Sequence, residues 1–278
     1  MRKQLYLIGM LYTLVVMSSC ETTVDIEISD YVEKLVVVGE ITEQAPPQIT
    51  LSRTVPYNAN GAIPKITDAQ VTINNDLGEI IVLQWSQDEG HYSAPAEIRG
   101  VSGRSYTLHI ELPDGSSYES FSELLNPVPD IDSLSAEFRI NELEDYEAWY
   151  VTSYFENPSF EASYYRWKVF VNDRLLGRSE DLAFGGIEGV LKGEPIGVEV
   201  FSAQLDQGDS IGIQQLSLTK EALQFLGELA IQANTIGGPF DPPAAPIVGN
   251  IRNKDDPNDY ALGYFFASSI VNKSIVIK

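Results

Sequence analysis

Short segments in which polar and apolar residues alternate recur along the first half of the chain, and they limit what it can fold into. The clearest cover residues 48–52, 69–73 and 105–112, and each has the two-residue period of a half-buried strand. Turn residues stand between them, as in Pro113-Asp114-Gly115-Ser116. Six or seven such strands in succession predict an antiparallel β-sandwich of immunoglobulin-like or prealbumin-like type over residues 33–125.

Strand patterns resume after a proline-rich segment at residues 126–130. Because proline restricts the backbone, this segment is predicted to be a stiff linker between two domains. Residues 131–278 are predicted to form a second β-rich domain, so the chain as a whole should be mainly β. Its expected strands cover residues 133–140, 149–155, 164–171, 196–203, 210–216, 247–251, 262–268 and 274–277, and the glycine-rich stretch 179–195 is expected to be irregular.

One amphipathic helix is predicted in this second domain, at about residues 219–235. Thr219 can cap its first turn, where the carboxylate of Glu221 is favourable, and Gly237-Gly238 can end it. We expect its apolar face to pack on the second sheet rather than to bind a partner. The residues of that face recur at helical spacing and are Ala222, Phe225, Leu226, Leu229, Ala230 and Ala233.

The N-terminus has the layout of a secretory signal peptide over residues 1–19, with two basic residues, an apolar stretch and two small serines. Cys20 follows directly and is the single cysteine of the chain, as in a bacterial lipobox. We therefore predict that Cys20 is lipidated and attaches the protein to a membrane; the alternative is an ordinary signal peptide with an incidental cysteine. Residues 20–32 then form an acidic tether, which favours display at the cell surface over a merely solvated linker.

The chain carries 40 acidic and 18 basic residues, a formal net charge of −22. Removal of residues 1–19 leaves 16 basic and 40 acidic residues, a net charge of −24. Such a chain repels phosphates, so we expect no nucleic-acid partner. It should also disfavour anionic ligands unless a local basic patch exists. Arg99 and Arg104 lie close in sequence and are candidates for one, although a solvated loop explains them as well.

Several segments taken in order resemble the Bacteroidota family called domain of unknown function 4249. They are Leu35-Val36-Val37-Val38-Gly39-Glu40-Ile41-Thr42, Gly103-Arg104-Ser105-Tyr106-Thr107-Leu108, Pro127-Val128-Pro129-Asp130-Ile131-Asp132-Ser133, Gly238-Pro239-Phe240-Asp241-Pro242-Pro243 and Leu262-Gly263-Tyr264-Phe265-Phe266-Ala267-Ser268. The resemblance implies an outer-membrane lipoprotein whose gene often neighbours that of a TonB-dependent receptor. It implies no catalytic residues, because the family has no defined activity.

Motifs for known chemistry are missing from the sequence. It contains no G-x-S-x-G nucleophile motif and no phosphate-binding glycine loop. His91 and His109 stand alone in strand-like segments and are expected to be partly exposed strand residues. Paired carboxylates can hydrolyse glycosides, but so many acids produce near pairs by chance and no spacing singles one out. We therefore expect no catalytic residue, no cofactor and no enzymatic activity.

Two clusters resemble ligand sites. Residues 253–259 carry Asp255, Asp256 and Asp259, whose oxygens suit Ca²⁺, yet the spacing of an EF-hand is missing and a solvated turn is favoured; no metal is predicted. The aromatic strand with Tyr164, Tyr165 and Trp167, together with Phe240 in the proline-rich stretch 238–246, offers a sugar platform or a protein contact. Alternation places Tyr165 and Trp167 on one face and Tyr164 on the other, so at least one of them should belong to the core.

From these observations we expect a non-enzymatic outer-membrane lipoprotein that serves a TonB-dependent nutrient receptor, either by capturing a ligand or by handing it over. A surface adhesive or structural module is the alternative, and a carboxylate-based hydrolase is the third hypothesis. The sequence does not identify the ligand.

Overall fold

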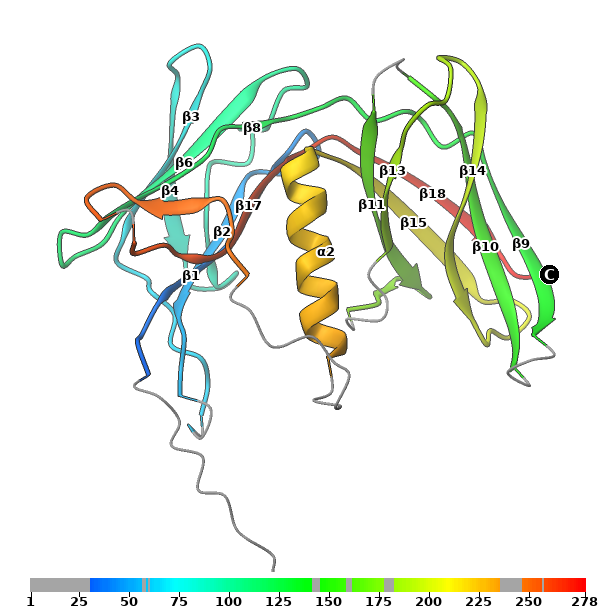
Figure 1. Cartoon of the computed structure of the whole chain (residues 1–278), viewed down its shortest axis with the longest axis horizontal. Helices are drawn as coiled ribbons and strands as arrows, with labels where there is room; N and C mark the ends of the chain where they lie inside the picture. Colours follow the sequence, from blue (N-terminus) through cyan, green and yellow to red (C-terminus); the bar gives the residue numbers. More distant parts are fainter. Residues whose placement is uncertain are drawn as a thin grey trace, which may run out of the picture. The chain divides into compact units, whose positions relative to one another are not determined.

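A computed structural model shows a mainly β chain with a single described helix, as predicted (Figure 1). The structure describes residues 31–56, 59, 61–141, 146–158, 162–177, 183–235, 247–256 and 258–278. Residues 33–278 form one compact unit. The predicted signal peptide, Cys20 and most of the tether lie outside the described residues, and so does the proline-rich stretch with Phe240.

The first sheet has ten strands in the order β16-β7-β6-β3-β4-β5-β2-β1-β17, with β8 paired to β6. Neighbouring strands are antiparallel except for β1 and β17, which are parallel. The strands are β1 (Leu35–Thr42), β2 (Gln48–Arg53), β3 (Gln70–Asn75), β4 (Ile80–Ser86), β5 (His91–Ser93), β6 (Ser105–Glu111), β7 (Ser117–Ser120), β8 (Glu123–Leu124), β16 (Ile251–Asn253) and β17 (Leu262–Ser268).

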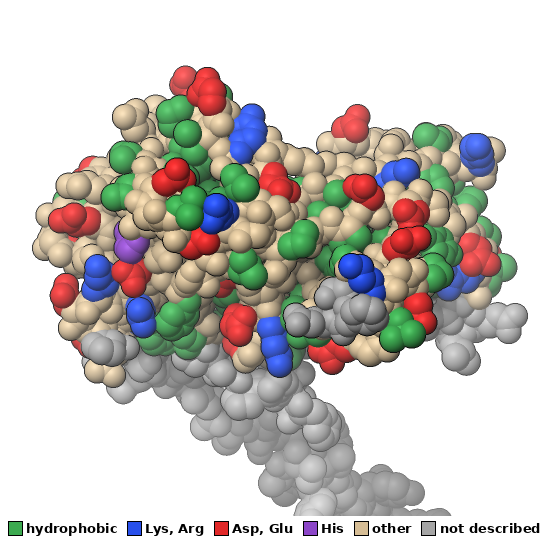
Figure 2. All heavy atoms as spheres, turned by 90° about the horizontal axis from the view of Figure 1, so that it is seen from above, with side chains coloured by type: hydrophobic (Ala, Val, Ile, Leu, Met, Phe, Trp, Pro, Cys, Tyr) green, Lys and Arg blue, Asp and Glu red, His purple; other side chains and the backbone are tan. Residues whose placement is uncertain are grey.

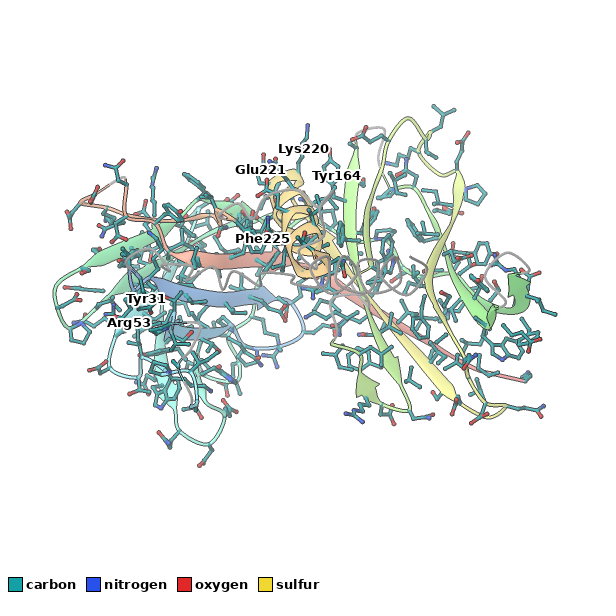
Figure 3. The ribbon with its side chains drawn as sticks, turned by 60° about the horizontal axis from the view of Figure 1, so that its bottom comes forward. Tyr31, Arg53, Tyr164, Lys220, Glu221 and Phe225 are labelled. Atoms are coloured by element: carbon teal, nitrogen blue, oxygen red, sulfur yellow. The ribbon has the colours of Figure 1, made fainter. Side chains whose placement is uncertain are left out.

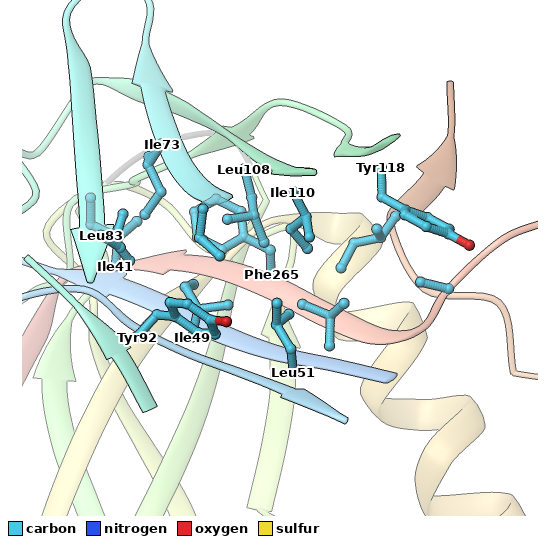
Figure 4. Packing of buried hydrophobic residues seen from close by; sticks show 14 of the residues in the cluster. Ile41, Ile49, Leu51, Ile73, Leu83, Tyr92, Leu108, Ile110, Tyr118 and Phe265 are labelled. Atoms are coloured by element: carbon cyan, nitrogen blue, oxygen red, sulfur yellow. The ribbon is translucent and has the colours of Figure 1, made fainter. Parts of the chain in front are cut away.

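Alternation explains how this sheet encloses its own core. Every second residue of β6 is buried, namely Tyr106, Leu108 and Ile110. These side chains meet Ile49 from β2 and Phe265 from β17 in one apolar cluster (Figure 4). Burying such side chains contributes about 1.5–3 kcal/mol each. The two-residue period therefore predicts the inward face of β6 correctly.

The domain boundaries differ from the prediction that residues 131–278 form a separate domain. Strands β16 and β17 come from that C-terminal segment, yet they pair with β7 and β1 in the sheet of the N-terminal half. The reason is packing: Ile251, Phe265 and Ala267 are buried in the same cluster as the N-terminal strands. The first half is therefore completed by the last part of the chain.

The second half is a pair of stacked sheets. A three-stranded sheet has the order β14-β10-β9, and a five-stranded sheet has the order β12-β11-β15-β18 with β13 paired to β11. Phe155 of the first and Tyr165 of the second meet edge to face with ring centroids 5.4 Å apart. The strands are β9 (Ser133–Asn141), β10 (Tyr146–Glu156), β11 (Ser163–Val171), β12 (Arg174–Leu175), β13 (Ala183–Ile187), β14 (Pro195–Ala203), β15 (Ser210–Leu218) and β18 (Ile270–Val276).

One extended segment belongs to both halves. Strand β17 lies in the first sheet, and after Ser269 the chain continues as β18 in the five-stranded sheet, as the red ribbon in Figure 1 shows. At the crossing point Ser269 N donates to Ser217 Oγ at 2.9 Å, and Ser217 N donates to Ser269 O at 3.1 Å. The predicted linker is held at the same place, because Ser217 Oγ donates to Asn126 O at 2.5 Å.

Helix α2 (Lys220–Asn234) begins where it was predicted, with Thr219 Oγ1 accepting from Ala222 N. Its buried residues are Ala222, Phe225 and Leu226, and the helix contacts β11, β13 and β15, which agrees with the expected packing on the second sheet. It also packs on β17 of the first sheet, where Phe225 meets Tyr264 and Phe266 with ring centroids 4.8 and 6.2 Å apart. The C-terminal end agrees with the predicted range, because the helix stops at Asn234 and is capped by Thr235, while Gly237-Gly238 lie outside the described residues.

Three other sequence expectations need correction. Residues 179–195 were expected to be irregular but contain β13, in which Gly186 leaves room for the Tyr164 ring; a Cβ there would lie 3.0 Å from that ring. Strand β16 begins at Ile251, so most of the predicted strand 247–251 lies outside it. Strand β18 begins at Ile270, four residues before the predicted strand 274–277.

Candidate functional site

Two cavities flank the first turn of α2. Their volumes are about 470 and 600 Å³, and Ser122, Thr219 and Glu221 line both. We call the two together the helix-start groove. Figure 3 shows Tyr164 of β11 across from Lys220 and Glu221, with Phe225 further along the helix. The remaining lining residues are Phe121, Glu123, Gln224, Glu228, Val248, Gly249, Asn250 and Tyr264 in the smaller cavity, and Leu124, Asn126, Pro127, Pro158, Ala162, Ser163, Tyr165, Ser217 and Leu218 in the larger.

A buried carboxylate fixes the floor of this groove. Glu123 is only 3% exposed and accepts three hydrogen bonds. Tyr264 Oη and Asn250 Nδ2 donate to Glu123 Oε1 at 2.6 and 3.0 Å, and Thr219 Oγ1 donates to Glu123 Oε2 at 2.8 Å. Thr219 thus caps α2 and holds Glu123 at once. A negative charge beside the N-terminal end of a helix is favourable, so this contact also stabilises α2.

Burial is the main cause of the pKa shifts of Glu123 and Tyr264 in this cluster. It raises the pKa of Glu123 above its usual value, although the three donors act in the opposite direction. It also raises the pKa of Tyr264, and the neighbouring Glu123 charge adds to that shift. Tyr264 donates its hydroxyl proton to a hydrogen bond with Glu123. We therefore interpret the cluster as a structural support for the start of the helix rather than as a pair for proton transfer.

The described lining residues offer contact area and polar groups. No histidine or cysteine is among those that the structure describes in either cavity. Across the described parts of the chain, no three His, Cys, Asp or Glu side chains are arranged to hold a metal ion. The walls instead offer aromatic rings from Phe121, Tyr164 and Phe225 beside hydroxyl and carboxylate groups. Such mixed surfaces bind small molecules through contact area and a few polar anchors.

Both histidines lie away from the groove, as partly exposed strand residues, which confirms the prediction. His91 Nε2 lies 3.3 Å from Glu89 Oε2, and His109 Nδ1 lies 3.2 Å from Glu119 Oε2. Their side chains are 17% and 28% exposed. Neither has a nucleophile beside it in these contacts.

The described residues of the segment 253–259 form a turn held by side-chain hydrogen bonds. Asn253 Oδ1 accepts from the backbone N–H groups of Asp255 and Asp256. Asp259 Oδ2 accepts from Tyr118 Oη at 2.8 Å and from Asn253 Nδ2 at 2.9 Å. These bonds engage Asn253 Oδ1 and Asp259 Oδ2 within a turn, in agreement with the solvated-turn interpretation.

The two arginines considered as a basic patch are engaged separately. Arg99 donates to the carbonyl oxygen of Ala96, and Arg104 lies 3.5 Å from Asp76. On the face shown in Figure 2, acidic side chains are dispersed among basic and apolar ones. The solvated-loop interpretation therefore fits these contacts better than a joint anion site.

The aromatic strand divides as alternation predicts. Tyr165 and Trp167 are buried in the core of the second half, where Trp167 Nε1 donates to Gln215 Oε1 at 2.8 Å. Tyr164 points to the opposite face and lines the groove. Of the predicted aromatic contact residues, Tyr164 and the buried Tyr165 both line the larger cavity. Phe240 and the predicted lipidation site Cys20 lie outside the described residues.

Sequence reasoning missed Glu123, Asn250 and Tyr264. None belongs to a recognisable motif, and Glu123 is one of 40 acids. The local pattern gives no signal for Glu123, because a hydrophobic pattern alone favours exposure of an acid. Its partners come from segments more than 90 residues away.

Among the described residues, no helix is long and apolar enough to cross a membrane. A comparison with curated proteins gives no match. The family model described as Domain of unknown function (DUF4249) matches residues 21–274, nearly the whole chain. The match extends across both halves and the strand they share, and so the chain belongs to the DUF4249 family.

Proposed function

We propose that this protein is a non-enzymatic outer-membrane lipoprotein that captures a small ligand in the helix-start groove and passes it to a TonB-dependent receptor. The observation that carries the binding part is the groove itself, whose walls come from α2, β8, β11 and β17. Because Glu123 ties three of its wall residues together, the groove is formed before any ligand arrives. A preformed site loses less entropy on binding.

Anchoring follows from Cys20. One acyl chain gives only marginal membrane binding, since each buried methylene contributes about 0.8 kcal/mol, whereas the two or three chains of a bacterial lipoprotein hold the protein permanently. The residues after Cys20 include Glu21, Asp25 and Glu27, which supports display on an outer surface. This placement would bring the groove close to a receptor in the same membrane.

The anchoring part is tested by fractionation of cells that express the full chain or its Cys20→Ala variant. We expect the wild type in the outer-membrane fraction and the variant in a soluble fraction. A variant that stayed membrane-bound would contradict the proposal. A TonB-dependent receptor should co-purify with the wild-type chain from detergent-solubilised outer membranes. If no receptor co-purifies, the proposed role as a receptor accessory is wrong.

The binding part is tested by mass spectrometry of small molecules that co-purify with the native protein. Tyr164→Ala removes a ring from the groove wall, and Tyr154→Ala removes a ring that is 39% exposed elsewhere. We expect the first variant to lose the bound compound and the second to retain it. If neither variant changes what is bound, the groove is not the capture site. Binding to matrix polymers without any receptor would instead favour the adhesive module.

A further inference from the structure

A third cavity adjoins the helix-start groove and differs from it in charge. Its volume is about 450 Å³, and its described lining residues include two bases, Arg252 and Lys254, and one acid, Glu119. It shares Phe121 and Val248 with the smaller cavity of the groove. We call it the basic cavity. A surplus of positive charge in a cavity needs an explanation in a chain whose net charge is −22.

Strand alternation gathers the polar residues of this cavity on one face of the first sheet. Ser120 and Ile251 are each 2% exposed and belong to the inner face. Their neighbours Glu119, Phe121 and Arg252 therefore lie on the outer face, where they line the cavity. In the pairing of β16 with β7, Arg252 lies directly across from Glu119. The sheet itself thus places a base, an acid and an aromatic ring on one wall.

A single carboxylate is shared by the basic groups. Arg252 Nη2 lies 3.4 Å from Glu119 Oε1, and Lys254 Nζ lies 3.6 Å from Glu119 Oε2. His109 Nδ1 also lies 3.2 Å from Glu119 Oε2. In the described parts of the chain, neither Arg252 nor Lys254 has a second carboxylate within ion-pair distance, and their side chains are 53% and 48% exposed. Since Glu119 neutralises one charge, one positive charge is left over.

Apolar contact area stands next to this charge. Phe121 and Val248 are 51% and 55% exposed, and both belong to the wall between the basic cavity and the groove. Arg252 Cζ lies 5.0 Å from the centre of the Phe121 ring, a cation–π contact that orients the guanidinium beside the ring. A ligand that covers Phe121 and Val248 removes apolar surface from water, which favours its binding.

We propose that the basic cavity holds the carboxylate of an organic acid whose apolar body lies on Phe121 and Val248 and extends into the helix-start groove. The planar fork of Arg252 matches a carboxylate through two parallel hydrogen bonds, and Lys254 adds a point charge. One surplus positive charge matches a monoanion, whereas Glu119 would repel a phosphate dianion more strongly. This inference rests on the proposed capture of a ligand in the groove and adds the chemical class of that ligand.

The proposal is tested with N-acetylphenylalanine, which has a carboxylate and an aromatic body, and with its C-terminal amide, which lacks the charge. Ligand-observed NMR follows their binding to the full chain in detergent at low ionic strength, because salt screens exposed charges. We expect the acid to bind at least about tenfold more tightly than the amide. Arg252→Gln should abolish this preference, whereas Arg174→Gln, at an exposed position of β12, should keep it. Equal affinity for acid and amide, or tighter binding of inorganic phosphate, would overturn the proposal.

Two further variants keep the test valid if Arg252→Gln does not fold. Glu119→Gln removes the competing carboxylate and should tighten binding of the acid but not of the amide. Phe121→Ala removes apolar contact area and should weaken binding of both compounds. Unchanged affinities in these two variants would overturn the assignment of the site.

The compound that co-purifies with the native protein separates this inference from the proposed function. If its retention depends on Tyr164 but it carries no carboxylate, capture in the groove stands and the organic-acid assignment is wrong. If no compound depends on Tyr164 while N-acetylphenylalanine still binds through Arg252, the basic cavity is supported and the role of the groove in capture is wrong.

Discussion

The side chain of Asn250 pairs with the backbone of Phe265 as a strand neighbour would. Asn250 Nδ2 donates to Phe265 O at 2.9 Å, and Phe265 N donates to Asn250 Oδ1 at 2.9 Å. The two ends of the ten-stranded order, β16 and β17, are thereby connected next to Glu123, which also accepts from Asn250. One buried amide thus helps to close the first sheet and to support the groove.

Replacing Asn250 by Ala should lower the free energy of unfolding by about 3 kcal/mol, because a buried N–H and a buried C=O on β17 lose their partners. Urea unfolding followed by tryptophan fluorescence measures this change. Asn258→Ala, at an exposed position of a turn, should change it by less than about 0.5 kcal/mol. Equal effects of the two substitutions would show that the pairing adds no stability.

Glu123 should make stability depend on pH. Burial raises its pKa above the ordinary value of 4.5, so the folded chain binds this proton more tightly than the unfolded chain. The stabilising contribution is complete below that ordinary value and is lost as the pH rises through the folded-state pKa. We expect Glu123→Gln to reduce the fall in the free energy of unfolding over this window. Asp88→Asn, at an exposed acid in the turn between β4 and β5, should leave the fall unchanged. Parallel pH profiles for all three proteins would contradict this.

Gly263 should tolerate no side chain. It adopts φ +91°, and a Cβ there would overlap the carbonyl of Val37 on the adjacent β1. Gly115 has nearly the same φ, +89°, but open space around it. Gly115→Ala should therefore cost only the left-handed backbone strain of about 1–2 kcal/mol. Gly263→Ala should cost clearly more or prevent folding, as read from circular dichroism and urea titration. A similar cost at both sites would mean that β1 and β17 can separate freely.

Thr219 should matter through both of its hydrogen bonds. Thr219→Ala removes the cap on Ala222 N and a donor to Glu123, and a lost cap alone costs about 1 kcal/mol. Thr219→Ser keeps the hydroxyl and should retain most of the stability in thermal unfolding. If Ser and Ala are equally destabilising, the methyl group rather than the hydroxyl is what the site requires.

The sequence predicted strands well where polar and apolar residues alternate, because one face of such a strand is buried and the other faces solvent. Residues 105–112 were expected as a strand and form β6 (Ser105–Glu111). The helix followed from apolar spacing and from the Thr219 cap. Pairing partners could not be predicted in this way, because a two-residue period indicates which face is buried but not which strand lies beside it. The parallel contact of β1 with β17, more than 220 residues apart, illustrates this limit.

The groove was harder to predict because its residues reverse the usual pattern. Phe121 is 51% exposed, whereas Glu123, two residues later, is 3% exposed. A hydrophobic pattern alone would place them the other way round. Glu123 can be buried because Tyr264, Asn250 and Thr219 satisfy it, and these partners become neighbours only after β16, β17 and α2 have assembled.

The strand segment shared by the two halves sets an order on folding. The N-terminal half cannot close its sheet until residues 262–268 are present, and these are synthesised long after β1. A nascent chain that ends before Leu262 leaves one edge of β1 open and part of its core uncovered. Completion of the first half therefore waits until the chain has been made through Ser268, and until then the N-terminal strands are held in an open sheet.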